Sequence, residues 1–222
     1  MITFTDVTVE KNGALVLNNL NLVISERRVG VIGRNGSGKS TFARLFNGVE
    51  VPSSGTVTVH GCDKRKELRR LVGFVFQNPD NQIVYPIVGE DLEFGLKNLG
   101  LPAPERQRRI DEILQRFDLA HLAQRLTHTL SGGEKQMIAL AGVLVMQPRV
   151  IVFDEPTTLL DLWNRHKLIA MLDSIEQDIV VVSHDLELLR GYERILHMEG
   201  GTIVDDGAPD DVIAGYVARS RC

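Results

Sequence analysis

One stretch of the sequence has the residue types and the spacing that hold a phosphate group. Residues 33–40 read GRNGSGKS and fit the pattern G-x-x-x-x-G-K-[ST]. Glycines let backbone N–H groups close around phosphate oxygens, the lysine reaches the β and γ phosphates, and the last hydroxyl is a ligand for Mg²⁺. A strand-like run before the loop and a helical stretch after it argue against a chance match. The candidate residues are Gly33, Asn35, Gly36, Ser37, Gly38, Lys39, Ser40 and Thr41.

Two adjacent carboxylates, Asp154 and Glu155, follow the apolar run Val150–Phe153. The carboxyl ends of strands in an α/β sheet line the ligand crevice. We predict that Asp154 holds Mg²⁺, directly or through water, and that Glu155 polarises an attacking water. Paired acids after a strand can also form a plain solvated turn, and the phosphate-binding stretch is what favours the catalytic interpretation.

A third stretch, residues 130–134 with the sequence LSGGE, opens a predicted helix. Ser131 with Glu134 three residues later fits a capping box, so local stability explains part of the pattern. It does not explain Gly132 and Gly133, which leave N–H groups open at a helix N-terminus and so predict a second anion site. One nucleotide cannot easily use both sites of one chain, and the pattern therefore predicts a head-to-tail dimer that shares them.

The elements that must position these residues are short β-like runs alternating with helical ones, a pattern typical of a mostly parallel sheet covered by helices. The opening of the chain predicts an antiparallel β subdomain, and residues from about 78 to 130 predict a helical subdomain insertion. We expect one α/β domain over residues 1–222. Core strands are predicted at 28–32, 72–76, 150–153 and 179–183, antiparallel strands at 2–9, 20–24 and 56–60, and helices at 41–46, 88–98, 104–117, 132–146 and 209–219.

The three motifs, in this order and spacing, resemble those of ATP-binding cassette (ABC) ATPases, a type of P-loop NTPase, over essentially the whole chain. The resemblance implies binding and hydrolysis of ATP with Mg²⁺. It also implies that Gln77 senses Mg²⁺ and the γ-phosphate, that Asp161 belongs to a loop at the nucleotide, and that His184 contacts the γ-phosphate. The implied catalytic residues are Glu155, His184 and Lys39, the Mg²⁺ ligands are Ser40, Gln77 and Asp154, and the partner-side nucleotide contacts are Ser131, Gly132 and Gly133.

A narrower resemblance rests on residues 76–84, FQNPDNQIV, and residues 90–95, EDLEFG. They are similar to the ATPases of energy-coupling factor (ECF) importers, which take up vitamins and transition-metal ions. Residues 28–33, RVGVIG, and the short tail resemble the biotin branch, and we expect no C-terminal dimerisation domain. The resemblance implies a second copy or a homologous ATPase, a transmembrane coupling protein, a substrate-binding membrane protein, and a peripheral place on the cytoplasmic face of the membrane. The alternatives are a cobalt, nickel or other ABC transporter, a soluble ABC protein of DNA repair or translation, and a regulator that binds nucleotide without hydrolysis.

Two positions depart from the family pattern. Residues 7–11, VTVEK, hold no aromatic ring to stack on adenine, since Phe4 comes too early, and only the Lys11 stem remains to cover the base. Residues 158–161 read TLLD, where the family has Ser-Ala before Leu-Asp. We therefore expect looser selection of the base, and a loop at residues 158–161 that differs from the family's.

The composition of the chain limits the classes of partner that it can bind. With 25 basic and 29 acidic residues the net charge is −4, which argues against a nucleic-acid partner. No apolar run reaches the roughly 20 residues that span a bilayer, so we expect a soluble chain that docks on a membrane protein. The apolar run 83–88, IVYPIV, is the predicted docking surface, unless it forms the inner face of the helical insertion. Cys62 and Cys222 are expected to be two free thiols.

Overall fold

The chain folds into two compact units, which we describe separately from a computed structural model covering residues 1–220. Unit 1 comprises Met1–Phe74, Arg149–Glu155 and the chain from Gln177 onward, and unit 2 comprises Val75–Pro148 and Pro156–Glu176. Cys62 is a free thiol as expected, and Cys222 lies outside the described residues. The single domain over residues 1–222 stays a prediction. Unit 2 is longer than the helical insertion expected at 78–130.

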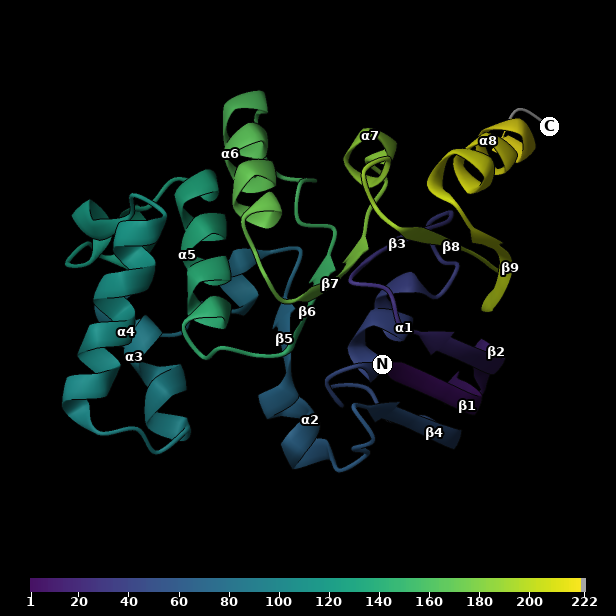
Figure 1. The fold of residues 1–222 in the computed structure, drawn as a ribbon, viewed down its shortest axis with the longest axis horizontal. Coiled ribbons are helices and arrows are strands. Elements are labelled where there is room, and N and C mark those ends of the chain that lie inside the picture. Colours follow the sequence, from purple (N-terminus) through teal and green to yellow (C-terminus); the bar gives the residue numbers. More distant parts are fainter. Residues whose placement is uncertain (221–222) are drawn as a thin grey trace. The chain divides into compact units, whose positions relative to one another are not determined.

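Unit 1 is built on a six-stranded sheet (Figure 1). Its strands are β3 (Arg28–Ile32), β5 (Val72–Val75), β6 (Val150–Asp154), β7 (Asp178–Val182), β8 (Arg194–Glu199) and β9 (Thr202–Gly207), in the order β5-β6-β7-β3-β8-β9. The pairs β6–β7, β7–β3 and β3–β8 are parallel, and β9 is antiparallel to β8. Strands β3, β6 and β7 are apolar and buried almost throughout, as expected of parallel strands covered on both faces, and helix α1 packs on β6 and β7. Parallel strands end at the same edge, so the residues that follow β3, β6 and β7 come together there.

A second, antiparallel sheet of unit 1 has the order β2-β1-β4. It consists of β1 (Ile2–Lys11), β2 (Ala14–Ile24) and β4 (Ser54–Val59). Phe4 on β1 stacks on Phe42 of helix α1 (Lys39–Leu45) at 4.9 Å between ring centroids, and both rings meet Phe46 at 5.1 Å. Burying each ring contributes about 2 kcal/mol. This cluster anchors α1, and with it the loop before α1, to the sheet.

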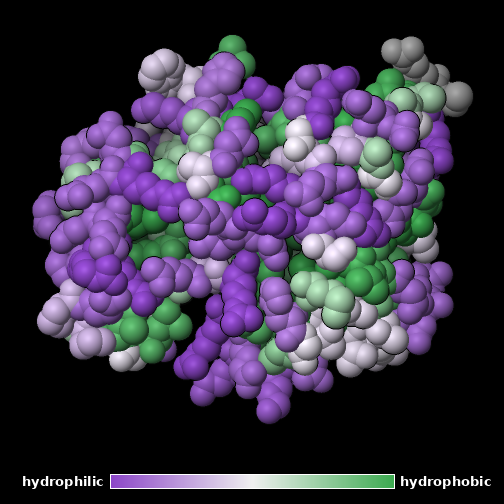
Figure 2. Space-filling view, viewed as in Figure 1, coloured by the Kyte–Doolittle hydropathy of each residue, from purple (hydrophilic) through white to green (hydrophobic). Residues whose placement is uncertain are grey.

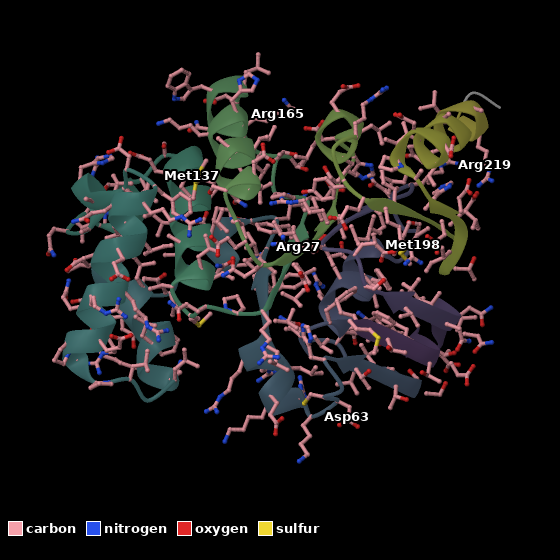
Figure 3. The ribbon with its side chains drawn as sticks, in the orientation of Figure 1. Arg27, Asp63, Met137, Arg165, Met198 and Arg219 are labelled. Carbon is pink, nitrogen blue, oxygen red and sulfur yellow. The ribbon has the colours of Figure 1, made fainter. Side chains whose placement is uncertain are left out.

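Three further helices complete unit 1: α2 (Arg65–Leu71), α7 (Leu186–Leu189) and α8 (Pro209–Ser220). Helix α8 packs on β8 and β9. Its Tyr216 ring lies edge-on to the buried His197 of β8, 4.9 Å between centroids. Arg219, which Figure 3 marks on α8, approaches the His197 Nδ1 at 3.3 Å. The end of the described chain is therefore tied to the strand beside β3.

Unit 2 is helical, as the sequence predicts for most of its length. Helix α5 packs against α3, α4, α6 and the turn η1, and it is buried over most of its length because nearly all its residues after Lys135 are apolar. No helix within residues 1–220 is long and apolar enough to cross a membrane. The elements are η1 (Pro79–Asn81), α3 (Val88–Asn98), α4 (Ala103–Arg116), η2 (Ala120–Leu122), η3 (Thr127–Thr129), α5 (Gly132–Leu144) and α6 (Leu162–Asp173).

Candidate functional site

The loop between β3 and α1 has a shape that only glycine permits at two positions. Gly33 has φ +148°, and a Cβ there would lie 2.2 Å from the carbonyl oxygen of Met198, a residue marked in Figure 3. Gly38 is the N-cap of α1 with φ +98°, and a Cβ there would lie 2.7 Å from Leu17 Cδ2. Both glycines are fixed by the fold of unit 1.

Lys39 folds back over this loop. Its Nζ donates hydrogen bonds to the Gly33 carbonyl at 2.8 Å and to the Arg34 carbonyl at 3.0 Å, and the residue is 6% exposed. Burial lowers the pKa of Lys39, and the carboxylates of Glu155 and Asp154 partly oppose this shift. A cation held against backbone carbonyls can exchange them for phosphate oxygens when a nucleotide enters.

The centre of the loop leaves room and hydrogen-bonding capacity for an anion. Gly36 has φ +81°, which favours glycine, and a Cβ there would meet no atom within 4 Å, so the space beside it is open. The hydroxyl of Ser37 is buried and makes no hydrogen bond within the described chain. An open cradle beside an unsatisfied buried hydroxyl fits a phosphate group.

Ser40 and Asp154 converge although 114 positions separate them in the chain. The Ser40 hydroxyl donates to Asp154 Oδ1 at 2.9 Å, and Asp154 is 3% exposed. Hydroxyl and carboxylate oxygens are the ligands that Mg²⁺ prefers, so this pair fits the ion. Arg44, which the sequence did not indicate, approaches Asp154 Oδ2 at 3.8 Å and offsets the charge of this carboxylate.

Glu155 and His184 meet at the same edge of the sheet. The His184 amide donates to Glu155 Oε2 at 3.2 Å, and His184 Nε2 lies 3.2 Å from Glu155 Oε1 and 3.0 Å from Asn35 Oδ1. Glu155 has φ +53°, a left-handed conformation that costs a non-glycine residue free energy. Its amide donates to the Val182 carbonyl at 2.9 Å, which helps to hold this strained conformation. Such strain, next to an imidazole and the phosphate loop, is typical of a residue positioned for chemistry.

Lys11, expected to cover the base, is engaged elsewhere in unit 1. Its ammonium pairs with Glu50 and lies 3.5 Å from the Thr41 hydroxyl. Thr41 follows Ser40 in α1, so Lys11 does lie beside the phosphate loop. Phe4 is buried against α1 and cannot stack on a nucleotide.

Unit 2 holds the other predicted site residues. Gln77 follows β5 and is exposed. Ser131 is the N-cap of α5 in a complete capping box: its amide donates to Glu134 Oε2 at 2.7 Å and its hydroxyl accepts from the Glu134 amide at 3.3 Å. The capping box predicted for Ser131 and Glu134 is therefore present.

The two glycines after Ser131 differ sharply. A Cβ at Gly133 would lie 2.2 Å from the side-chain carbon Cγ of Asn164, so α6 requires that glycine. A Cβ at Gly132 would meet nothing within 4 Å, and φ there is not positive. Neither the backbone nor the packing of the described chain explains Gly132. Its bare backbone is open to a ligand.

Asp161 and Asn164 work together under Gly133. Asp161 is the N-cap of α6: its Oδ1 accepts from the Asn164 amide at 2.8 Å, and its Oδ2 accepts from the Asn164 side chain at 3.0 Å. Asp161 thereby aims Asn164 at the start of α5. Sequence reasoning missed Asn164. The Asp-x-x-Asn spacing of a helix cap was the available signal, although it gives no hint of Gly133.

Each unit thus gathers part of the predicted set. Unit 1 brings Lys39, Ser40, Asp154, Glu155 and His184 to one sheet edge around the loop that starts at Gly33, while unit 2 presents Ser131 and Gly132 at the open end of α5. The roles expected of these residues stay predictions.

Comparison with known proteins gives a consistent picture. Residues 17–158 match the family described as ABC transporter. A putative ABC transporter ATP-binding protein of Deinococcus radiodurans is 54% identical over 92% of each chain. A biotin transport ATP-binding protein, BioM, of Rhizobium etli is 43% identical over 97% of each chain. An energy-coupling factor transporter ATP-binding protein of Clostridium novyi is 39% identical over 92% of this chain and 77% of the relative.

Solved structures agree with the fold. CbiO1 from Clostridium perfringens, described as part of the ABC transporter complex CbiONQ, superposes with a TM-score of 0.85 at 33% identity, covering 99% of this chain and 93% of the other. A dimeric ATP-binding cassette in a post-hydrolysis state with ADP and Pi superposes with a TM-score of 0.82 at 29% identity, covering 94% and 99%. The predicted α/β fold class, with its antiparallel sheet and helical region, is confirmed.

Proposed function

The chain belongs to the ABC transporter family as an ATP-binding, ATP-hydrolysing subunit of the ECF type, and we propose that it energises biotin uptake through membrane partners at the cytoplasmic face. The observation that supports biotin as the transported solute is the 43% identity with a biotin transport ATP-binding protein over nearly the full length of both chains. We further propose that the whole chain forms one ATP-binding domain.

We assign the chemistry of hydrolysis to unit 1. The loop from Gly33 to Thr41 binds the phosphates, and Lys39 leaves its two carbonyl partners to neutralise the terminal phosphates. Glu155 accepts a proton from the attacking water, and His184 holds Glu155 and the γ-phosphate in place. Ser40 and Asp154 would hold Mg²⁺, and the ion would offset charge on the phosphate oxygens. The part expected of Gln77, which lies in unit 2, stays a prediction.

We assign the second half of the nucleotide site to another chain. Ser131 and the bare backbone of Gly132 would hold the γ-phosphate of ATP bound to the partner's loop, and Asp161 would line the same interface. The open space at Gly132 supports this assignment, since nothing within residues 1–220 uses it. The partner is a second copy or a homologous ATPase, as in the dimeric relative.

A mixing experiment tests the shared site. Lys39→Ala removes the phosphate contact and Ser131→Arg blocks the partner-side contact, so each variant alone should lack hydrolysis. A mixture of the two restores one intact site per mixed dimer, and phosphate release should reappear. A mixture as inactive as either variant alone would count against the shared site, once ATP binding by Ser131→Arg has been shown.

An exchange experiment tests biotin. The chain replaces BioM in Rhizobium etli cells, and uptake of labelled biotin is measured together with co-purification of the chain with detergent-solubilised membrane proteins. We expect uptake with the wild-type chain and none with Lys39→Ala. Co-purification and ATP hydrolysis without biotin uptake would contradict the biotin assignment and turn attention to cobalt or nickel.

The proposed docking surface for the membrane partner is an exposed apolar cluster of unit 2, made of Val84, Tyr85, Phe94 and Leu126. The Tyr85 and Phe94 rings lie 5.1 Å apart, and Asp91 Oδ1 accepts from the amides of Val84 and Tyr85 at 2.8 and 2.9 Å. Figure 2 shows that hydrophobic patches interrupt the hydrophilic surface of the molecule. The expectation that the whole run 83–88 is exposed was wrong for Val88, which is buried because it begins α3 on its inner face.

Two substitutions test this surface. Val84→Asp and Tyr85→Asp should remove the chain from solubilised membrane complexes and leave its basal ATP hydrolysis within a few-fold of normal. Val23→Asp, an exposed apolar position on β2 of unit 1, is the matched control and should still co-purify. Complexes that survive both substitutions would place the docking surface elsewhere.

A further inference from the structure

An open cavity of about 500 Å³ lies within unit 2, apart from the residues assigned to the nucleotide. The end of α4, the turn η2, the first turns of α5 and helix α6 line it. Its volume falls in the range of pockets that hold small organic molecules. Of its lining residues, Glu134 belongs to the LSGGE stretch and Asn164 packs against Gly133. The proposed ATPase chemistry does not use the cavity itself.

The floor of this cavity is apolar. Leu119, Leu122, Met137 and Met171 line it and are buried. Met137, which Figure 3 marks on α5, brings a flexible thioether that adapts to an irregular apolar ligand. A ligand would therefore need an apolar body.

The rim carries cations that have no carboxylate partner within residues 1–220. Arg116 donates to the Ser174 carbonyl at 2.6 Å and lies 5.3 Å from the Phe117 ring centre, while Lys167 lies 5.4 Å from the ring centre of Trp163. Both cations line the cavity and both are exposed. Their remaining N–H donors are available to an anionic group at the mouth.

Two acidic residues limit the charge of that anion. Glu134 and Asp118 also line the cavity. Glu134 is engaged by the Ser131 amide and hydroxyl at 2.7 and 2.8 Å, so it does not neutralise Arg116 or Lys167. A second negative charge on the ligand would meet these carboxylates. One carboxylate suits the rim better than a doubly charged phosphate.

We propose that this cavity binds a small amphipathic monocarboxylate. Its apolar body lies on Leu122, Met137 and Met171, and its carboxylate lies between Arg116 and Lys167. This binding requires neither ATP nor a partner chain, so it stands or falls independently of the proposed transport function.

Octanoate is the probe, titrated calorimetrically into the full chain without nucleotide. We expect one site, with binding of 1-octanol and of octyl phosphate each at least tenfold weaker. Trp163, the one tryptophan of the sequence, lies under Lys167 and should change its fluorescence as octanoate binds. Equal binding of octanoate and 1-octanol, or no binding at millimolar octanoate, overturns the proposal.

Variants locate the ligand. Lys167→Gln and Arg116→Gln should each weaken octanoate binding at least fivefold. Arg108→Gln is the matched control, because Arg108 lies on α4 outside the cavity and pairs with Glu105 and Glu112. Ala170→Phe fills the cavity from an exposed position and should abolish binding without loss of fold. Binding to a folded Ala170→Phe chain at wild-type strength, or equal losses in the Arg108 and Arg116 variants, overturns the proposal.

Discussion

The phosphate loop of unit 1 and the Ser131 segment of unit 2 are both glycine-rich helix starts, yet they are held in different ways. The loop is fixed by residues far away in the sequence: Ser40 meets Asp154, and Asn35 meets His184 across 149 positions. The Ser131 segment is held by hydrogen bonds to Glu134, three residues away. The conformation of the phosphate loop therefore depends on contacts across unit 1, whereas the Ser131 cap depends on contacts within one helix turn.

The difference shows what each element can do alone. The loop has its cation, its acid and its imidazole assembled, so it can be preorganised for a reaction. The Ser131 segment offers open backbone and a hydroxyl but no acid or base of its own apart from the capping Glu134. Its complement has to come from outside, which agrees with the two-chain site proposed above.

The largest expected effect comes from Glu155→Gln, which removes the proposed general base of the assembled site. The amide keeps the size and the hydrogen bond to the His184 amide but cannot accept a proton from water. ATP should still bind, and phosphate release should fall about 100-fold or more. Glu187→Gln, an exposed position three residues after His184, is the matched control and should retain normal turnover. Near-normal turnover in Glu155→Gln would contradict the role given to Glu155.

The second effect separates the two glycines of the Ser131 segment. Gly133→Ala places a methyl against Asn164 and should lower the free energy of unfolding by about 1–3 kcal/mol. Gly132→Ala should leave that free energy unchanged or raise it by under ~1 kcal/mol, because alanine favours a helix, yet it should reduce ATP hydrolysis. Urea unfolding and phosphate release distinguish the two.

The control for this pair is Asn164→Ala combined with Gly133→Ala. Removing the Asn164 amide makes room for the new methyl and should recover part of the lost stability. Equal unfolding free energies for the two single glycine variants would contradict the distinction drawn between them.

The same contrast explains which parts were predictable from sequence. The phosphate loop has a local spacing with a known mechanism, and β3 and α3 have the bounds predicted for them, because turn residues and apolar periodicity mark both ends. Strand β8, with the sequence RILHME, was missed because Arg194, His197 and Glu199 mask its apolar character. Helix α6 was missed because it follows an irregular loop and its apolar stripe is weak.

Residues that act through tertiary contact left no signal in the sequence. Asn164 is recognisable as important only once α6 lies against Gly133, and Arg44 only once α1 lies beside β6. Conversely, Ser131 and Glu134 were predictable as a capping box because their geometry is confined to one turn.

Acidification should affect the two regions at different pH. Burial, followed by the charge of Arg219, holds the pKa of His197 below its ordinary 6.5, so the unfolded state binds a proton more readily. Stability from this residue is complete above about pH 6.5 and falls as the pH drops below it. His197 pairs with Ile32 directly before the phosphate loop, so unit 1 should respond first.

The capping box should respond only at lower pH. Hydrogen bonds from the Ser131 amide and hydroxyl hold the pKa of Glu134 below its usual 4.5, so its contribution is present above pH 4.5 and is lost as the pH falls further. Amide exchange, divided by the intrinsic exchange rate at each pH and measured from pH 7.5 down to about pH 3, should quicken at residues 29–32 before it quickens at 132–135. His197→Gln should flatten the first response, whereas His166→Gln, at an exposed position, should not. Simultaneous quickening in both segments would contradict the contrast.

The smallest expected effect concerns the surface of unit 1 that would contact the adenine base. Lys11 pairs with Glu50 and lies near Thr41, and a base at this edge would meet a methylene stem rather than a ring. Lys11→Tyr supplies a π-face beside Thr41 and should tighten ATP binding about fivefold, close to 1 kcal/mol. Lys11→Met keeps an apolar stem without charge or ring and should bind ATP about as the wild type does, which separates stacking from loss of the ion pair. Because stacking accepts either purine, GTP binding should improve in parallel, as titration of both nucleotides would show. Equal affinities of the Tyr and Met variants would mean that the base does not lie on Lys11, and the assembled phosphate loop would then carry ATP binding largely on its own.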